Sequence, residues 1–377
     1  MEPFCKIHGI NVKRIAIFTA GFGEGHNSAA RNIRQALVEK AAGACQADVF
    51  DLFEQCYPKT NQLFRGIYAF AIKRTPLLWR WFYRSLDRLT AVQDRLGAFR
   101  DVRAAMERLV VEGGVDVFAS VYPVYNFAIA GMDDAIAAKI RTVTVITDSI
   151  TINSVWLRAG CEHYIVPNDM TADVVRKHGV ADGQVHTLGF PVQTVFCHPE
   201  AFGPFPDPRD GPRLLFVVNT GDALALRIAE ALIGIPWLRM TISAGKRPRL
   251  EQRLRRLAAA SDRRVEVMGW TDEMPKLLMT HHALIGKCGG ATTQEAIAAH
   301  CPMIVNKIVP GQEEGNWDLL RLTGGGVLAS SPDEIKGAVV EMFADGAAKW
   351  RRMRENLDRI ARPDAAIRIA EYLMRLA

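Results

Sequence analysis

Short apolar runs alternate with longer amphipathic stretches from residue 12 onward, and this alternation is typical of an α/β protein. After the first run, Ala30, Ile33 and Leu37 recur at helical spacing. Strand-length runs in the first half of the chain occur at 12–19, 45–51, 115–121, 142–147, 163–166 and 185–188. The pattern predicts a first α/β domain.

A proline-rich stretch at 203–212 interrupts this pattern with four prolines and two glycines in ten residues. The alternation then restarts, with strand-length runs at 214–218, 238–243, 265–268, 283–286, 303–306 and 326–329. We therefore predict an N-terminal domain over 1–202, a linker over 203–212 and a C-terminal domain over 213–361. The amphipathic segment 362–377 is expected to form a helix that can pack back on the first domain.

The stretch 283–316 carries the most informative chemistry of the second half. The turn at Gly289 and Gly290 leads into a predicted helix over 291–299, whose first turn exposes unpaired N–H groups and a partial positive charge. Such a helix start is a good anion site. Glu295 lies one turn into this helix, where its carboxylate can accept hydrogen bonds from sugar hydroxyls.

The polar loop that closes this stretch adds Gln312, Glu313 and Asn316, which are side chains able to bind hydroxyl groups. A phosphate and a polyol held side by side would be a nucleotide sugar. The alternative is an ordinary strand–turn–helix with a polar surface loop, because a single Gly-Gly turn is not a specific signal.

The first predicted strand runs into a loop with glycines at 21, 23 and 25, followed by His26. We expect a helix to begin after His26, with Asn27 or Ser28 as its cap. The helix dipole would lower the pKa of His26, and a neutral imidazole can accept a proton. A purely structural role for His26 is the alternative. The glycine spacing does not match a dinucleotide-binding fingerprint, and no Lys-Ser/Thr pair follows.

Asp148 follows the apolar run 142–147 directly, at a predicted carboxyl end, where α/β sheets place their ligands. Its carboxylate could orient a base or an acceptor hydroxyl, or it could cap a turn.

The 377 residues are 49% hydrophobic, which is enough for a substantial core. The seven cysteines are scattered without a CxxC pair, which suits a reducing cytosol and argues against a zinc site or a disulfide framework. We expect no signal peptide and no membrane-spanning helix, because no uncharged apolar run reaches about 18 residues. Any membrane contact would then be made from the surface.

The region 57–103 is strongly basic, with ten Lys or Arg and three Asp between residues 59 and 103, in a chain of net charge +6. Arg80, Arg84 and Arg88 are spaced four apart on one helical face, and Trp81 lies at its border. This pattern is typical of an interfacial anchor on anionic lipid. An ordinary packed helix with solvated arginines is the alternative, and nucleic acid ranks lowest because no companion motif is present.

Several motifs together resemble a known family. They are TAGFGEGH at 19–26, ITDS at 146–149, GFPV at 189–192, AGK at 244–246, GKCGGATTQEA at 286–296 and VPGQEEGN at 309–316. They resemble the diacylglycerol glycosyltransferases, which include plant-type monogalactosyldiacylglycerol synthases and bacterial processive diacylglycerol glucosyltransferases. The resemblance covers roughly 12–360. It implies the GT-B architecture, which is two Rossmann-like α/β domains with an interdomain cleft.

The resemblance also implies residue roles. His26 would be the general base that deprotonates the acceptor hydroxyl. Gly290, Ala291 and Thr292 would hold the donor diphosphate at the helix start, beside Gly289. Glu295 would take the ribose hydroxyls.

Two further roles complete the implied donor site. Gln312 and Glu313 would read the sugar, and Lys246 would offset charge on the leaving UDP. The sequence departs from the family at NTGDALAL, where only Gly221 remains of a glycine-rich loop, and at Cys288.

The resulting hypothesis is an inverting glycosyltransferase that moves a hexose from UDP-glucose or UDP-galactose to diacylglycerol. It would act as a peripheral protein at the cytosolic membrane face, without a metal ion or a cofactor, since no DxD-like motif is apparent. A transferase for another lipid-linked or soluble acceptor, a sugar-nucleotide epimerase and a non-catalytic nucleotide-sugar-binding protein are the alternatives.

Overall fold

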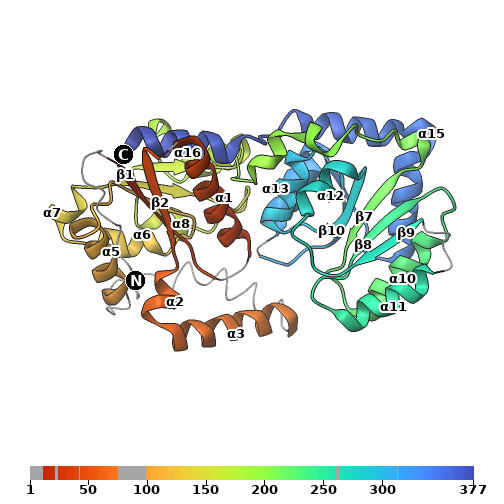
Figure 1. Cartoon of the computed structure of the whole chain (residues 1–377), viewed down its shortest axis with the longest axis horizontal. Helices are drawn as coiled ribbons and strands as arrows, with labels where there is room; N and C mark the ends of the chain where they lie inside the picture. Colours follow the sequence, from red (N-terminus) through yellow and green to blue (C-terminus); the bar gives the residue numbers. More distant parts are fainter. Residues whose placement is uncertain (1–11, 22–23, 42, 75–98, 260–263, 312) are drawn as a thin grey trace. The chain divides into compact units, whose positions relative to one another are not determined.

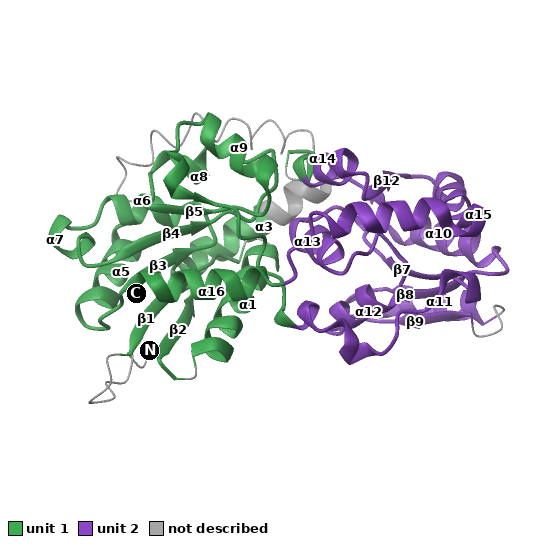
Figure 2. Ribbon diagram, turned by 90° about the horizontal axis from the view of Figure 1, so that it is seen from above, with its two compact units in different colours: residues 1–194, 310–315, 364–377 green, residues 195–309, 316–363 purple. Residues whose placement is uncertain are grey.

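A computed structural model describes residues 12–21, 24–41, 43–74, 99–259, 264–311 and 313–377. The chain divides into two compact units, coloured green and purple in Figure 2. Unit 1 comprises Met1–Thr194, Pro310–Gly315 and Asp364–Ala377, and unit 2 comprises Val195–Val309 and Asn316–Pro363. The chain thus leaves unit 1 before the predicted linker 203–212 and returns to it for the C-terminal segment.

Unit 1 is built on a six-stranded parallel sheet with the strand order β2-β1-β3-β4-β5-β6. Its strands are β1 Lys13–Phe18, β2 Cys45–Phe50, β3 Val117–Ser120, β4 Arg141–Val145, β5 His163–Ile165 and β6 Val185–His186. The order of the strands reverses between β1 and β3, and ligands of open α/β sheets bind outside the carboxyl ends at such a point.

Helices follow the strands of unit 1, since parallel strands need crossover connections, and a final helix is added from the C-terminal end of the chain. They are α1 Glu24–Ala41, α2 Leu52–Cys56, α3 Pro58–Arg74, α5 Arg100–Val111, α6 Tyr125–Ala130, α7 Asp134–Ala137, α8 Val155–Arg158, α9 Asp169–Lys177 and α16 Ala365–Leu376. The C-terminal helix α16 lies along α1 (Figure 1), and its buried face consists of three alanines, Ile369 and Leu373.

Unit 2 repeats the architecture with the strand order β12-β11-β10-β7-β8-β9, again all parallel. Its strands are β7 Arg213–Val217, β8 Arg239–Ser243, β9 Val265–Met268, β10 Ala283–Lys287, β11 Met303–Lys307 and β12 Gly326–Leu328. Its helices are α10 Asp222–Ile233, α11 Pro248–Ala258, α12 Met274–Thr280, α13 Gly290–Ala298, α14 Glu314–Thr323 and α15 Pro332–Asp358. Here the order of the strands reverses between β7 and β10.

An aromatic cluster beneath the carboxyl ends of β1 and β3 sets the position of the loop after β1. The Phe18 ring lies 4.9 Å from Phe118 and 5.1 Å from Tyr125, centroid to centroid. The Tyr125 hydroxyl donates to the Thr19 carbonyl at 2.8 Å and accepts from the Leu52 amide at 2.9 Å. These buried bonds hold the chain that leads toward His26.

The core of unit 2 includes part of the predicted linker. Phe205 stacks on Trp350 with centroids 6.1 Å apart, and the Pro206 carbonyl lies 3.0 Å from Nε2 of His282. Both partners are buried in this unit. The middle of the proline-rich stretch, at Phe205 and Pro206, is therefore packed against unit 2.

The α/β class with two parallel sheets is as predicted, and the predicted strands match within one or two residues at most ends. The start of the first helix is a correction. Helix α1 begins at Glu24, so His26 lies inside its first turn and neither Asn27 nor Ser28 is the cap. The Asn27 side chain instead accepts a hydrogen bond from the Thr19 hydroxyl at 2.9 Å.

Across the described parts of the chain, no helix combines the length and the apolar character that crossing a bilayer requires.

Candidate functional site

Unit 1 gathers its candidate chemistry at the point where the order of its strands reverses. His26 enters from the helix after β1, Val121 follows β3, and Thr147 and Asp148 follow β4. These four residues come from three neighbouring strand ends. The placement is the one expected for a ligand site of an open α/β sheet.

Nδ1 of His26 has two oxygen partners. It lies 2.9 Å from the Val121 carbonyl and 2.9 Å from Oγ1 of Thr147. A carbonyl oxygen can only accept, so Nδ1 must carry the proton. In the neutral ring Nε2 is then unprotonated and able to accept one.

The surroundings keep the imidazole of His26 neutral. Burial lowers its pKa, while the charge of Asp148 and the Val121 carbonyl act in the opposite direction. The sequence suggested the helix dipole as the cause, but desolvation is the largest effect here. Burial likewise raises the pKa of Asp148, against the opposing influence of His26 and a hydrogen bond from Trp156.

Two aromatic side chains line the imidazole. The ring of Tyr122 meets His26 edge-on at 5.2 Å, and the ring of Trp156 lies 6.1 Å away. Nε1 of Trp156 donates to Oδ2 of Asp148 at 2.8 Å. Trp156 therefore packs beside the His26 ring and also orients the Asp148 carboxylate. Neither aromatic residue was singled out from the sequence, because only the fold brings them to His26.

Unit 2 gathers its candidate chemistry where β7 and β10 meet. Helix α13 begins at Gly290 with Gly289 as its N-cap, and no side chain caps this end. The amides of Gly290, Ala291 and Thr292 thus form the open first turn, as predicted. The positive end of the helix and these N–H groups suit a phosphate.

Glu295 has an unusual electrostatic position on this helix. Burial alone raises the pKa of its carboxyl group to about 7. Within the described residues its carboxylate has no hydrogen-bond or ion-pair partner. Hydrogen-bond donors from a ligand would stabilise the charged form of this buried carboxylate. Two vicinal hydroxyls are such donors.

Further polar atoms near these strand ends are buried without a partner among the described residues. They are the side-chain amide atoms of Asn219 and Asn306, the hydroxyls of Thr220 and Thr293, and Oδ1 of Asn316. Buried polar groups are almost always hydrogen-bonded, so this concentration indicates a site that binds a polar molecule. The unpartnered atoms were not foreseen, because side-chain burial cannot be read from spacing.

The altered loop around Gly221 is held by Arg247, another residue that the sequence did not suggest. Its guanidinium donates to the carbonyls of Val218 at 2.6 Å and Thr220 at 2.8 Å, and it reaches Asp222 at 3.3 Å. The loop that lacks the family's glycines is therefore fixed by side-chain bonds. Next to it, Nζ of Lys246 lies 5.2 Å above the Trp270 ring.

The remaining predicted donor residues lie in and after the loop 310–316. Asn316 Nδ2 donates to the Cys288 carbonyl at 3.1 Å, which ties the start of α14 to the turn before α13. Glu313 is buried, with 5% of its surface exposed, and is grouped with unit 1. Gln312 lies outside the described residues. Cys288 is fully buried, as a small packed residue would be.

The predicted membrane residues Arg80, Trp81, Arg84 and Arg88 also lie outside the described residues. The structure thus brings His26 and Asp148 together in unit 1, and Gly289–Glu295 together with Asn316 in unit 2. Among the described residues, no three His, Cys, Asp or Glu side chains are grouped so that they could hold a metal ion.

Comparison with known proteins identifies relatives in sequence. The family model for monogalactosyldiacylglycerol (MGDG) synthase matches residues 26–192. A processive diacylglycerol β-glucosyltransferase of Bacillus mycoides is 24% identical over 367 residues, covering 96% of this chain and 93% of that protein. A probable chloroplastic monogalactosyldiacylglycerol synthase of Glycine max is 26% identical, covering 98% of this chain and 72% of that protein.

Solved structures support the fold. MurG of Acinetobacter baumannii superimposes with a TM-score of 0.62 at 15% identity, covering 96% of this chain and 99% of that one. The UDP-GlcNAc 2-epimerase of Neisseria meningitidis also gives a TM-score of 0.62, at 12% identity and with 97% and 100% coverage. The resemblance seen in the motifs is confirmed: the chain is related to the diacylglycerol glycosyltransferases over nearly its whole length and has the GT-B fold.

Proposed function

We propose that this protein is a glycosyltransferase that moves a hexose from UDP-glucose or UDP-galactose to the free hydroxyl of diacylglycerol, with inversion. The observation that carries the proposal is the bonding of His26. Its Nδ1 is committed to the Val121 carbonyl at 2.9 Å, which directs the basic lone pair to Nε2. The sequence relationship to diacylglycerol glycosyltransferases supports the choice of substrates.

In the proposed reaction, Nε2 of His26 takes the proton from the acceptor hydroxyl as its oxygen attacks the anomeric carbon. The lowered pKa of His26 keeps the ring neutral beforehand. The carboxylate of Asp148 then stabilises the imidazolium, and Trp156 holds that carboxylate in place. The attack occurs opposite the leaving group, so the configuration inverts.

The diphosphate of the donor is proposed to bind at the first turn of α13. The amides of Gly290, Ala291 and Thr292 would stabilise the charge that develops on the leaving UDP. Glu295 would accept the ribose hydroxyls, and those bonds would favour its charged form. Lys246 would add positive charge, and Gln312, Glu313 and Asn316 would bind the hexose. With these donors, we propose that the reaction needs neither a metal ion nor a cofactor.

The membrane contact is also a proposal. Helix α3 exposes three apolar side chains, Leu63 at 63%, Phe64 at 55% and Ile67 at 53% of their surface. Lys59 lies one turn before Leu63 on the same helix. An exposed apolar face beside basic charge fits a lipid surface, as the sequence of 57–103 suggested. We propose that this region holds the protein at the cytosolic face of the membrane.

The test combines product formation and membrane binding. The protein is incubated with vesicles containing diacylglycerol and an anionic lipid, together with a panel of UDP-sugars, and the lipid product is identified by mass spectrometry. We expect a hexosyl-diacylglycerol that also forms in the presence of a chelator. Product only from another acceptor would overturn the proposed substrate, and donor binding without any product would indicate a non-catalytic protein.

The same vesicles test the membrane contact. Replacing Arg80, Arg84 and Arg88 with Glu should release the protein from anionic vesicles, since each basic residue contributes about 1 kcal/mol near such a surface. Co-sedimentation equal to that of the wild-type protein would refute the anchor.

A further inference from the structure

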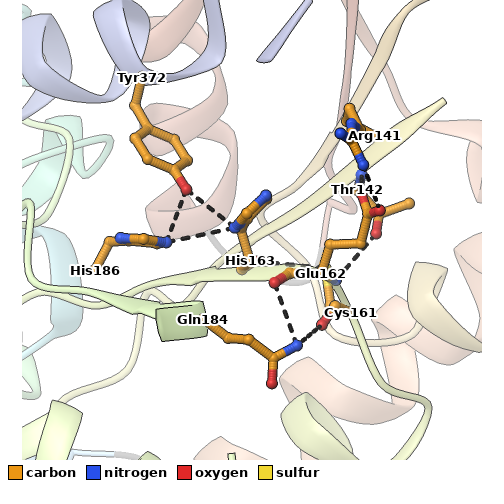
Figure 3. Close-up of polar contacts among 8 residues, drawn as sticks. All are labelled: Arg141, Thr142, Cys161, Glu162, His163, Gln184, His186 and Tyr372. Atoms are coloured by element: carbon orange, nitrogen blue, oxygen red, sulfur yellow. Dashed lines mark hydrogen bonds and ion pairs between the residues drawn. The ribbon is translucent and has the colours of Figure 1, made fainter. Parts of the chain in front are cut away.

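A second cluster of proton-binding side chains lies at the sheet edge of unit 1, apart from His26. Nδ1 of His163 and Nε2 of His186 are 3.4 Å apart, and the Tyr372 hydroxyl lies 3.0 Å from the first and 2.7 Å from the second (Figure 3). All three side chains are partly exposed, so the cluster can be reached from solvent. None of the three is part of the proposed transfer reaction.

The fold explains why these residues meet. In the parallel pairing of β5 with β6, Ile165 is opposite His186, and His163 lies two residues before Ile165. Side chains two apart on a strand share a face, so both imidazoles project from the same side of the sheet. Helix α16 supplies Tyr372 from the C-terminal end of the chain.

The backbone that carries the two histidines is braced on both sides. Glu162, next to His163, accepts from the Thr142 amide at 2.9 Å and pairs with Arg141 at 3.1 Å (Figure 3). Nε2 of Gln184 donates to the Cys161 carbonyl at 3.2 Å and the Glu162 carbonyl at 3.3 Å. The side chains therefore start from fixed positions.

The three atoms are spaced as metal ligands are. Zn²⁺ binds nitrogen and oxygen at roughly 2.0–2.2 Å with tetrahedral geometry, which sets neighbouring ligand atoms about 3.3 Å apart. From the separations of 3.4, 3.0 and 2.7 Å, a point roughly 1 Å off the plane of the three atoms lies about 2.1 Å from each of them.

We propose that Nδ1 of His163, Nε2 of His186 and the oxygen of Tyr372 form a binding site for a divalent transition-metal ion of the Zn²⁺ type. Water would occupy the fourth position. The third ligand of this site is a tyrosine, which distinguishes it from sites built only of His, Cys, Asp and Glu. The ion would join two strands to a helix that is 186 and 209 residues away in sequence.

The charges around the cluster are compatible with metal binding at neutral pH. Burial lowers the pKa of both histidines; for His163 Glu162 opposes this and Arg141 adds to it, and for His186 the neighbouring His163 adds to it. Both rings are therefore neutral ligands at pH 7. Burial raises the pKa of Tyr372, and the charge of Arg375 opposes this in part. Coordination as phenolate would release the phenol proton to solvent as the metal–oxygen bond forms.

The test uses the full-length protein, stripped of metal with a chelator, and ZnCl₂ alone as the probe. We expect one equivalent of Zn²⁺ to bind by calorimetry, with proton release seen as a dependence on buffer ionisation enthalpy. His163→Gln and His186→Gln should each weaken binding by about tenfold or more, and Tyr372→Phe by less. His178→Gln is the matched control, because His178 is exposed and its ring, within the described ranges, contacts the Val174 carbonyl of the preceding helical turn.

A second measurement needs no variant. X-ray absorption of the wild-type protein loaded with one equivalent of Zn²⁺ should show only nitrogen and oxygen ligands at about 2.0 Å. Sulfur in the first shell would assign the ion to a cysteine and overturn the proposal. Absence of stoichiometric binding, or unchanged binding in the His163→Gln/His186→Gln double variant, would overturn it as well. Transferase activity is not the readout, so this result is independent of the proposed reaction.

Discussion

Around His26 the polar groups already bond within the protein, whereas on helix α13 the Glu295 carboxylate and the Thr293 hydroxyl have no partner among the described residues. In unit 1, Val121 and Thr147 fix Nδ1 of His26, and Trp156 fixes Asp148. In unit 2, the Glu295 carboxylate has no partner among the described residues, and its pKa rises to about 7 through burial alone.

The difference follows from what each region is proposed to do. A general base works only in one tautomer and one orientation, so its bonds must exist before the substrate arrives. A donor pocket gains its binding energy from bonds made with the ligand, so polar groups kept free for the ligand are an advantage there. The residues proposed to react are thus already hydrogen-bonded within the protein, whereas the Glu295 carboxylate, proposed to bind the donor, has no such bond among the described residues.

The largest expected effect comes from replacing His26, the proposed general base in unit 1. His26→Ala should lower kcat by about 10²-fold or more, the usual size for loss of a general base, with UDP affinity unchanged. Steady-state kinetics and calorimetry with UDP measure the two quantities. His178→Ala, at the exposed C-cap residue of helix α9, is the control and should leave both unchanged. Near-normal turnover in the His26→Ala variant would show that His26 is not the general base.

Glu295→Gln tests the binding side. The variant keeps the shape of the side chain but loses its charge, so hydrogen bonds from the ribose become weaker by about 1.5 kcal/mol, or roughly tenfold in UDP affinity. Calorimetry at pH 8 measures the change, because the carboxyl group, with its pKa of about 7, is then mainly charged. Equal affinities of wild type and variant would show that Glu295 does not contact the nucleotide.

The pH dependence of stability gives a second measure of the same residue. Burial raises the pKa of Glu295 from 4.5 to about 7, so without ligand the folded state binds its proton more tightly than the unfolded state. Its contribution to stability is present below pH 4.5 and is lost as pH rises through about 7. Denaturant unfolding should show this loss in the wild-type protein, and Glu295→Gln should flatten it.

Trp156→Phe tests the support of Asp148, the carboxylate with a proposed catalytic role, and has a smaller expected effect. The ring remains, but Asp148 loses the hydrogen bond that opposes the burial-induced rise of its pKa. The pKa of Asp148 should rise further, and the acidic limb of the kcat/KM profile should move to higher pH, with up to about tenfold loss at its optimum. An unshifted profile would mean that Trp156 only fills space.

The smallest expected effects are changes in the free energy of unfolding when either of two threonines is replaced by valine. Denaturant unfolding measures both. Thr147→Val removes a hydroxyl that bonds His26, and should destabilise unit 1 by about 1 kcal/mol. Thr293→Val removes a fully buried hydroxyl that has no partner in the described part of the chain, and should stabilise unit 2 by a similar amount while weakening donor binding. Changes of the same sign in both variants would contradict the contrast between the two regions.

Much of the fold could be predicted from local patterns. Apolar runs of strand length and helical repeats depend on nearest neighbours, so the strands and the Gly289–Gly290 turn before α13 were placed within one or two residues. The start of α1 was misplaced because Asn27, a good cap by residue type, bonds Thr19 instead. A choice between a local and a distant partner cannot be made from composition.

The sequence by itself determined the α/β class, the tandem arrangement of two sheets, and the candidacy of His26, Asp148 and Glu295, because each depends on short-range spacing. Only the tertiary structure decided which atoms meet. Val121 reaches His26 across 95 residues, and Tyr372 reaches His163 across 209. The tautomer of the base, the unpartnered carboxylate and the sheet-edge cluster all arise from such long-range contacts, whose geometry depends on how strands and helices pack.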